Sequence, residues 1–292
     1  MHRFTIILGV LAIIGLSSFY FYTRPGTLPA DFLSGLQGNV KRGETVFHAA
    51  GCASCHTAPN AEPSTLPILQ GAQSFSSPFG VFMAPNISPD PTYGIGNWSA
   101  LDLANAMKLG TSPDGTHYYP AFPYTSYSRT TPQDVIDLHA FIQTLPADTT
   151  PSQPHDIKFP FNIRLSLGIW KLLFADANWI TDASTVKQKR GRYLVEALGH
   201  CGECHTSRER LGNLNRNLWL KGASNPSGKG TVPDITPSTL GWSEQDLAYY
   251  FETGFTPLYD SAGGHMAHVV QNLSRLTSND REAIAAYLIS LP

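Results

Sequence analysis

All four cysteines of the chain lie in two short motifs, CASCH at 52–56 and CGECH at 201–205, each ending in a histidine. The pattern Cys-x-x-Cys-His indicates covalent attachment of a c-type haem. The two thiols add across the haem vinyl groups, and the adjacent histidine becomes the proximal iron ligand. The sequence therefore predicts two covalently bound haem c groups. The residues that would hold them are Cys52, Cys55 and His56 for haem 1, and Cys201, Cys204 and His205 for haem 2.

Other uses of a Cys-x-x-Cys pair fit the chain less well. The two pairs of a zinc ribbon lie about 15–20 residues apart, whereas here the length of a domain separates them. A thioredoxin-type redox pair does not require a neighbouring histidine. As disulfides, two such short loops would cross-link little of a 292-residue chain.

The second half of the chain repeats the first, with equivalent strings in the same order. The pairs are KRG (41–43 and 189–191), the two haem motifs, PNISP (85–89) with PDITP (233–237), NWSALDLANAMKLGTSP (97–113) with GWSEQDLAYYFETGFTP (241–257), and TTPQDVIDLHAFIQTLP (130–146) with LTSNDREAIAAYLISLP (276–292). A duplication of this length predicts two domains, over 38–146 and 187–292, with one haem each.

Each copy predicts three helices. The first leads into the haem motif, over 41–53 and 188–202. The second and third are bounded by cap residues and carry apolar side chains at helical spacing. These cap residues are the N-caps Ser99 and Ser243, the C-terminal Gly110 and Gly254, and the N-caps Thr131 and Thr277.

The N-terminus carries an uncharged run, Phe4–Tyr22, between Arg3 and Arg24. As a helix it would span roughly 28 Å, about one hydrocarbon core. A cleaved signal peptide is the alternative, but the run is longer than a usual signal core and ends in aromatic residues that suit a membrane interface. We expect residues 1–28 to be an uncleaved single-pass anchor in a bacterial inner membrane, with the haem domains in the periplasm.

Residues 147–186 separate the two copies. They contain a Pro-rich linker, 147–160, and the apolar segment FNIRLSLGIWKLLF, 161–174. This apolar segment is too short to span a bilayer. We expect it to pack between the domains or against a partner, or to rest on the membrane surface.

The net charge argues against nucleic acid as a partner. The formal net charge is −2 with a pI near 6.5, and a nucleic-acid-binding protein would need a basic face.

The strings GRYLVEALGHCGECHT (191–206), APNISPDPTYGIGNWS (84–99), YPAFPY (119–124) and the final AYLISLP resemble class I cytochrome c. The tandem resembles the membrane-anchored dihaem cytochromes that accompany periplasmic dehydrogenases. This resemblance implies an all-α fold of two tandem class I cytochrome c domains after an N-terminal transmembrane helix. It also implies an electron-transfer protein, not an enzyme, that carries electrons from an alcohol, aldehyde or sugar dehydrogenase to a quinone, cytochrome or terminal oxidase. The alternative is a dihaem redox enzyme of the peroxidase kind, which would use an open or His-ligated haem 1.

The distal iron ligand of haem 2 is expected to be Met266. Methionine is the usual sixth ligand in class I cytochromes c and raises the reduction potential. Met266 follows two glycines in a loop before the last helix. Its neighbours His265 and His268 are expected to be surface residues.

The sixth ligand of haem 1 stays open in the sequence. The repeat places Phe122 at the position of Met266, and related cytochromes often carry methionine there. Phenylalanine cannot ligate iron. The alternatives are a tentative bis-His site with His117, a methionine from elsewhere (Met83 or Met107), and an iron that is five-coordinate or binds water.

Overall fold

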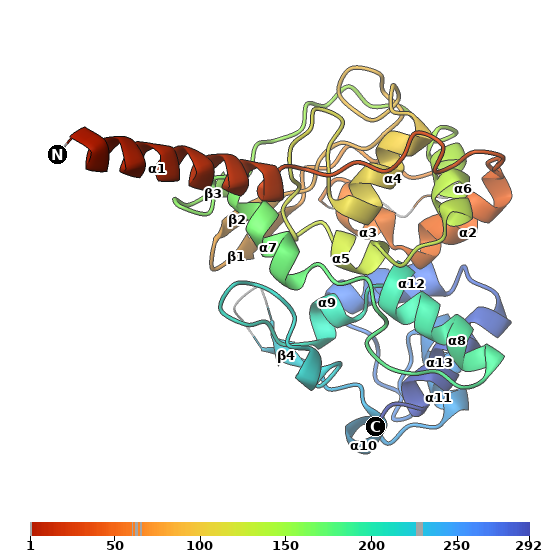
Figure 1. Cartoon of the computed structure of the whole chain (residues 1–292). Coiled ribbons are helices and arrows are strands. Elements are labelled where there is room, and N and C mark those ends of the chain that lie inside the picture. The colour runs from red at the N-terminus through yellow and green to blue at the C-terminus, as the bar shows by residue number, and fades with distance from the viewer. Residues whose placement is uncertain (1, 60, 62–63, 65, 226–229) are drawn as a thin grey trace.

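Helices dominate the computed structural model, which describes residues 2–59, 61, 64, 66–225 and 230–292. A long N-terminal helix, α1 (His2–Thr23), projects from a body that contains the rest of the described chain (Figure 1). This helix is long and apolar enough to cross a membrane, and its apolar window is fully exposed.

The helices of the first half return in the second half in the same order. The first half contains α2 (Val40–Ala49), α3 (Cys52–His56), α4 (Ala100–Leu109), α5 (Tyr124–Tyr127) and α6 (Pro132–Ile142). The second half contains α8 (Val186–Arg192), the π-helix η1 (Tyr193–Leu198), α9 (Gly202–His205), α11 (Glu244–Thr253), α12 (His265–Leu273) and α13 (Ser278–Ile289). Between them lies α7 (Ser166–Phe174), and two short helices, the 3₁₀ turn η2 (Arg216–Leu218) and α10 (Pro237–Leu240), precede α11.

The predicted helix ends are confirmed where a cap residue marks them. Ser99 and Ser243 each form a capping box with an aspartate three residues later, and both helices end at a glycine in the left-handed conformation. The helices that lead into the haem motifs were predicted wrongly as continuous. Gly51 and His200, at equivalent positions before the motifs, have φ of +62° and +41°, which interrupts each helix there.

Short strands follow each haem motif, and the all-α prediction did not include them. Strands β1 (Ser74–Ser77) and β2 (Gly80–Met83) form an antiparallel hairpin, to which β3 (Asp156–Ile157) adds antiparallel to β2. The second half has the shorter hairpin of β4 (Ala223–Ser224) and β5 (Thr231–Val232). Because β3 belongs to residues 147–160, this predicted linker is attached to the first half.

In each half the first and last helices cross at a glycine. A Cβ on Gly43 of α2 would lie 2.0 Å from the carbonyl oxygen of Asp137 on α6. A Cβ on Gly191 of α8 would lie 1.8 Å from the carbonyl oxygen of Ala283 on α13. The glycine of the repeated string KRG therefore permits a backbone contact that no other residue allows.

The arginine of the same string pairs with the last helix. Arg42 donates to the buried carboxylate of Asp137 from Nε at 2.6 Å and from Nη2 at 3.0 Å, and the Asn39 amide and Gln133 side chain donate to it as well. Arg190 pairs with Asp280 of α13 at 2.7 Å.

Replacing Asp137 with Asn is expected to cost about 2 kcal/mol at pH 7, because several donors lose a charged acceptor. Burial alone would raise the pKa of Asp137, but its hydrogen bonds from Arg42, Asn39 and Gln133 hold that pKa below its usual value. The contribution is therefore present above the unfolded pKa of about 3.9 and is lost as the pH falls through the lower folded pKa. Urea unfolding at pH 7 and pH 3 should show a smaller pH difference for Asp137→Asn than for the wild type. An unchanged difference would contradict this assignment.

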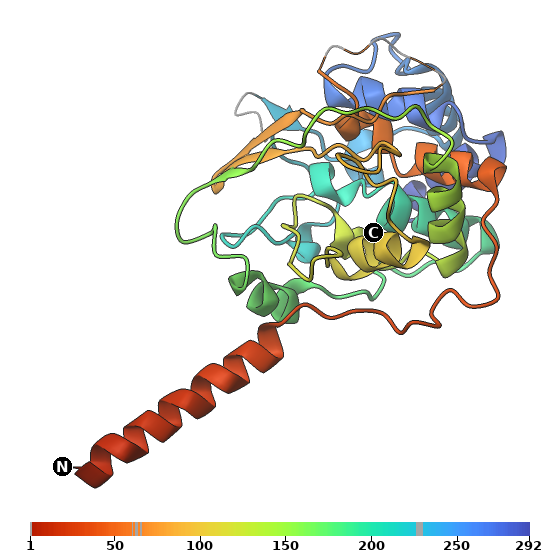
Figure 2. The same ribbon diagram turned by 90° about the horizontal axis from the view of Figure 1, so that it is seen from above.

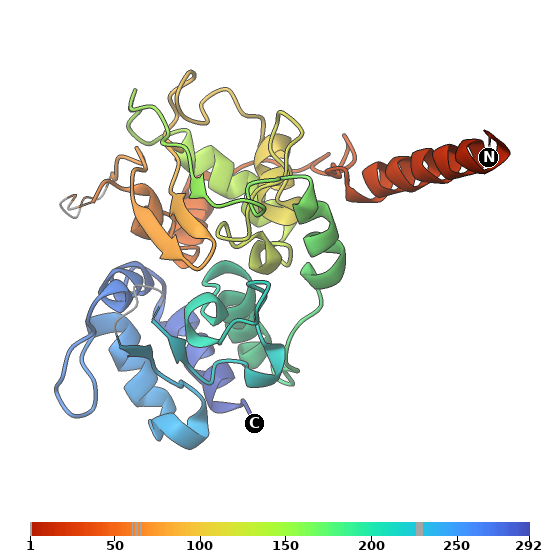
Figure 3. The ribbon, with the colours of Figure 1, turned by 90° about the vertical axis from the view of Figure 1, so that its left-hand side faces the viewer.

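The two halves share one hydrophobic core. A single cluster of buried side chains includes Phe47 and Leu138 from the first half and Val195 and Tyr287 from the second. Figures 1 and 3 show the halves packed side by side, and Figure 2 shows α1 extending away from both. Helix α12 contacts α2 and α3, while α5 contacts η1. The segment around each haem motif therefore lies against the other half.

Candidate haem-binding sites

Each proximal histidine is held by a carbonyl from the repeated proline string. The Nδ1–H of His56 donates to the carbonyl of Pro85, and that of His205 donates to the carbonyl of Pro233, both at 2.8 Å. Burial lowers the pKa of both imidazoles. The rings are therefore neutral with Nδ1 protonated, which leaves the Nε2 lone pair free for iron.

Sequence reasoning identified the strings PNISP and PDITP as repeats but gave them no role. The backbone also fixes the histidines, since Gly71 N donates to the His56 carbonyl and Gly222 N donates to the His205 carbonyl, both at 2.7 Å. The two sites are thus built from equivalent parts.

The cysteines lie in apolar surroundings. Burial raises the pKa of Cys52 and of Cys201 to about 12. It raises the pKa of Cys55 to about 11, with a smaller contribution from the nearby Cys204. Cys52, Cys55 and Cys201 are partly buried and Cys204 is exposed. Paired thiols followed by an imidazole with a free Nε2 fit a haem c, which would supply reversible one-electron redox chemistry when bound.

Each haem motif lies against the other half of the chain, which the sequence did not predict. Helix α12 of the second half contacts α3, which carries the first motif. Polar contacts join each motif to the other half: Asn272 Nδ2 donates to Ser54 Oγ at 2.8 Å, and Thr125 Oγ1 donates to Glu203 Oε1 at 3.5 Å. Ser54 and Glu203 occupy the same position in the two motifs.

Tyr127 of α5 contacts the residues that precede both motifs. Its hydroxyl donates to the Ala50 carbonyl at 3.1 Å, and its ring packs edge-on against His200 with centroids 5.5 Å apart. The side chain is buried. Tyr127 therefore connects the two sites, and no motif in the sequence indicates this role.

Met266 and Phe122 occupy corresponding places in the two halves. Met266 lies in the first turn of α12, not in a loop as predicted, and Phe122 lies just before α5. Both side chains are partly buried against the shared core. Met107 is buried in α4, as expected for a core residue.

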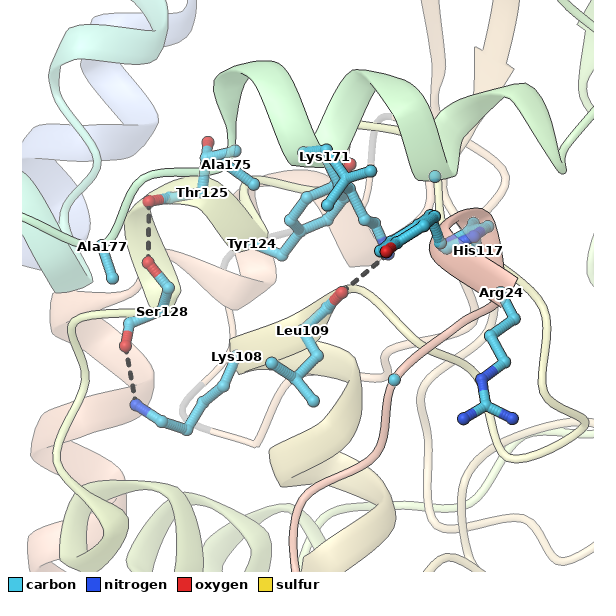
Figure 4. Close-up of a pocket in the computed structure, with 14 residues that line it drawn as sticks. Arg24, Lys108, Leu109, His117, Tyr124, Thr125, Ser128, Lys171, Ala175 and Ala177 are labelled. Carbon is cyan, nitrogen blue, oxygen red and sulfur yellow. Dashed lines mark hydrogen bonds between the residues drawn. The ribbon is translucent and has the colours of Figure 1, made fainter. Parts of the chain in front are cut away.

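The structure pairs His117 with the anchor. Its Nε2 is 2.7 Å from the carbonyl oxygen of Thr23 at the end of α1, and its side chain is buried. His117 lines a cavity of about 300 Å³ between α1, α4 and α7, and none of the described lining residues belongs to a haem motif. Figure 4 shows Lys171 of α7 in this cavity, directed at the Leu109 carbonyl. The imidazole therefore has a hydrogen-bond partner at Nε2 in this structure.

The variant His117→Ala is therefore expected to leave the electron paramagnetic resonance spectrum of the oxidised haems unchanged. It should cost about 1–2 kcal/mol of stability, because the Thr23 carbonyl loses its partner. Spectra and urea unfolding of the full chain in detergent would check both expectations. Loss of a bis-His signal in the variant would instead restore His117 as the sixth ligand of haem 1.

Comparison with known proteins supports the assignment of the chain as a c-type cytochrome. The family model for cytochrome c matches residues 40–146. A dihaem cytochrome c-type protein of Cereibacter sphaeroides is 51% identical over 97% of this chain and 96% of its own length. The fructose dehydrogenase cytochrome subunit of Gluconobacter japonicus is 40% identical, and the gluconate 2-dehydrogenase cytochrome c subunit of Pantoea cypripedii is 35% identical. They match 87% and 91% of this chain, which spans 53% and 63% of their own lengths. The chain thus belongs to the cytochrome c family, as a dihaem c-type cytochrome similar to the cytochrome subunits of dehydrogenases.

Proposed function

We propose that the protein relays electrons from a periplasmic dehydrogenase to a quinone, a cytochrome or a terminal oxidase. The observation that carries this proposal is that each haem motif is hydrogen-bonded to the other half, Ser54 to Asn272 and Glu203 to Thr125. Side chains of both halves form one hydrophobic core beside the motifs, and Tyr127 and Asn272 contact both halves. Two redox sites held in one packed body suit electron transfer between them better than separate reactions at each site.

Residues 187–292 act in this proposal as a second class I cytochrome c domain. The support comes from the equivalent helices, the equivalent glycine crossing at Gly191 and the matching proximal histidine, His205. His205 and Met266 would provide the axial ligands of haem 2.

Replacing Met266 with Leu is expected to lower the potential of haem 2 by on the order of 0.1 V, within the span of about 0.8 V that axial ligands cover. Redox titration of the full chain would show one of two potentials moving. Leu258→Ala, an 89% exposed control in the same half, should move neither. Equal potentials in Met266→Leu and the wild type would exclude Met266 as the ligand.

The reactivity of haem 1 distinguishes an electron-transfer protein from a peroxidase-like enzyme. Phe122 replaces the expected methionine, and His117 pairs with Thr23, so that haem 1 would keep its sixth position open or filled by water. If haem 1 is only a relay, excess peroxide should not be turned over by the reduced protein. Steady peroxide consumption that is inhibited by cyanide would favour the peroxidase-like alternative.

The dehydrogenase partner is proposed from the named subunits that the chain resembles. In this proposal α1 anchors the haem domains to the periplasmic face of the inner membrane. Affinity purification of the full chain from gently solubilised membranes should recover a dehydrogenase whose substrate reduces the haems. If substrate-dependent haem reduction occurs only with a soluble dehydrogenase from the other side of the membrane, this placement is wrong.

A further inference from the structure

Helix α7 has an apolar face that nothing in the described chain covers. Ile169, Leu172 and Leu173 follow one another at helical spacing and are 42%, 65% and 65% exposed. The opposite face is covered, since Leu167 and Gly168 are buried. An exposed stripe of large aliphatic side chains on a well-packed helix marks an interaction surface.

The covered face of α7 fixes this helix to the end of the membrane anchor. A Cβ on Gly168 would lie 2.2 Å from the Thr23 carbonyl oxygen, so the backbones of α7 and α1 are in direct contact. Figures 1 and 2 show α7 crossing the end of α1 and not continuing along it. The position of α1 in a bilayer therefore determines the position of α7.

Two further contacts hold α7 against the haem domains. Lys171 Nζ donates to the carbonyls of Leu109 and Gly110 at the end of α4, both at 2.7 Å. Trp170 Nε1 donates to the carbonyl of Leu211 in the second half at 2.9 Å. Helix α7 thus contacts the anchor and both halves. Its exposed face cannot turn inward without breaking these hydrogen bonds.

The end of α1 has the features of a membrane interface. The side chains of Phe19, Tyr20, Phe21 and Tyr22 are exposed around its last turn, and aromatic side chains favour the headgroup level. The exposed Arg24 follows, with its guanidinium 4.7 Å from the centre of the Phe21 ring. A cation at this level suits anionic phospholipid headgroups. A helix packed against Thr23 lies at the same depth, where exposed leucines would meet acyl chains.

We propose that α7 is a second membrane contact, an in-plane helix whose Ile169, Leu172 and Leu173 enter the lipid surface beside the anchor. The proposal rests on the proposed insertion of α1. Its consequence is that the haem domains are held in one orientation and do not swing on a flexible tether. The lipid surface covers the α7 side, and the face of the second half that is distant from α1 stays open.

Spin labels on the full chain in nanodiscs of phosphatidylethanolamine and phosphatidylglycerol would test this contact. Haem attachment consumes the four native thiols as thioethers, so one introduced cysteine is the sole labelling site. The variants are Leu173→Cys on α7, Leu11→Cys in the anchor, and Leu258→Cys, an exposed leucine in the second half, as the matched control. The measurement compares the accessibility of each label to oxygen, which partitions into lipid, and to a water-soluble nickel chelate.

The labels at 173 and 11 are expected to be more accessible to oxygen than to nickel, and the label at 258 more accessible to nickel. If the label at 11 is exposed to lipid but the label at 173 behaves like that at 258, α7 lies in water. The inference is then wrong, while the proposed insertion of α1 is retained. If 11 is also exposed to nickel, α1 is not inserted and the proposed anchoring fails with it. Protection of 173 from both reagents would mean that protein covers α7, which also overturns the inference.

Discussion

Replacing Cys201 and Cys204 together with Ser is expected to reduce the haem content of the purified chain from two to one per polypeptide. A hydroxyl cannot form the thioether, and His205 alone would hold a haem only by its iron. The site of haem 1 should remain loaded, because His56 has its own partner in Pro85. The ratio of haem, measured as the pyridine haemochrome, to protein gives the result directly.

The mirror variant Cys52→Ser with Cys55→Ser serves as the matched control and should also retain one haem. Denaturing gels stained for covalent haem would show half the wild-type intensity in each variant. A variant that retains two covalent haems would contradict the assignment of its motif. Complete loss in only one variant would mean that this motif is needed for the folding of both halves.

Gly191→Val is expected to destabilise the second half by at least about 3 kcal/mol. Even one additional carbon would lie 1.8 Å from the Ala283 carbonyl oxygen, so α8 and α13 must separate where they cross. Because both helices contribute to the core shared by the halves, the loss should also lower the unfolding midpoint of the whole chain. Urea unfolding followed by circular dichroism would measure it.

Gly26→Val is the control for this substitution, because nothing lies within 4 Å of a Cβ at that position. It should change the free energy of unfolding by less than about 0.5 kcal/mol. Gly43→Val, at the equivalent crossing in the first half, should be as harmful as Gly191→Val. A well-folded Gly191→Val protein with wild-type stability would show that the two helices do not cross as described.

The local features of the fold were predictable because short strings specify them. Serine followed by aspartate three residues later indicates a capping box at Ser99 and Ser243, and both are present. The repeated glycine of KRG and the two haem motifs also keep equivalent positions in the two halves. These features depend on residues that are close in the chain or that the duplication displays twice.

The features that the sequence did not reveal depend on contacts between distant residues. His117 pairs with a carbonyl 94 residues away, and a lone histidine near the expected distal position cannot show this. The contact of Tyr127 with Ala50 and His200 depends on how the halves pack, as does the hydrogen bond between Asn272 and Ser54. The exposed face of α7 likewise resembles a core stripe until the positions of its neighbours are known.

Photoreduction with less than one electron per protein tests most directly the proposal that two adjacent haem sites exchange electrons. Single-haem variants first give the spectrum of each haem. In the wild type, the electron should then redistribute between the haems in a first-order step whose rate does not depend on protein concentration. If redistribution is absent, or if its rate rises in proportion to protein concentration, electrons move only between molecules, which would contradict the proposed relay.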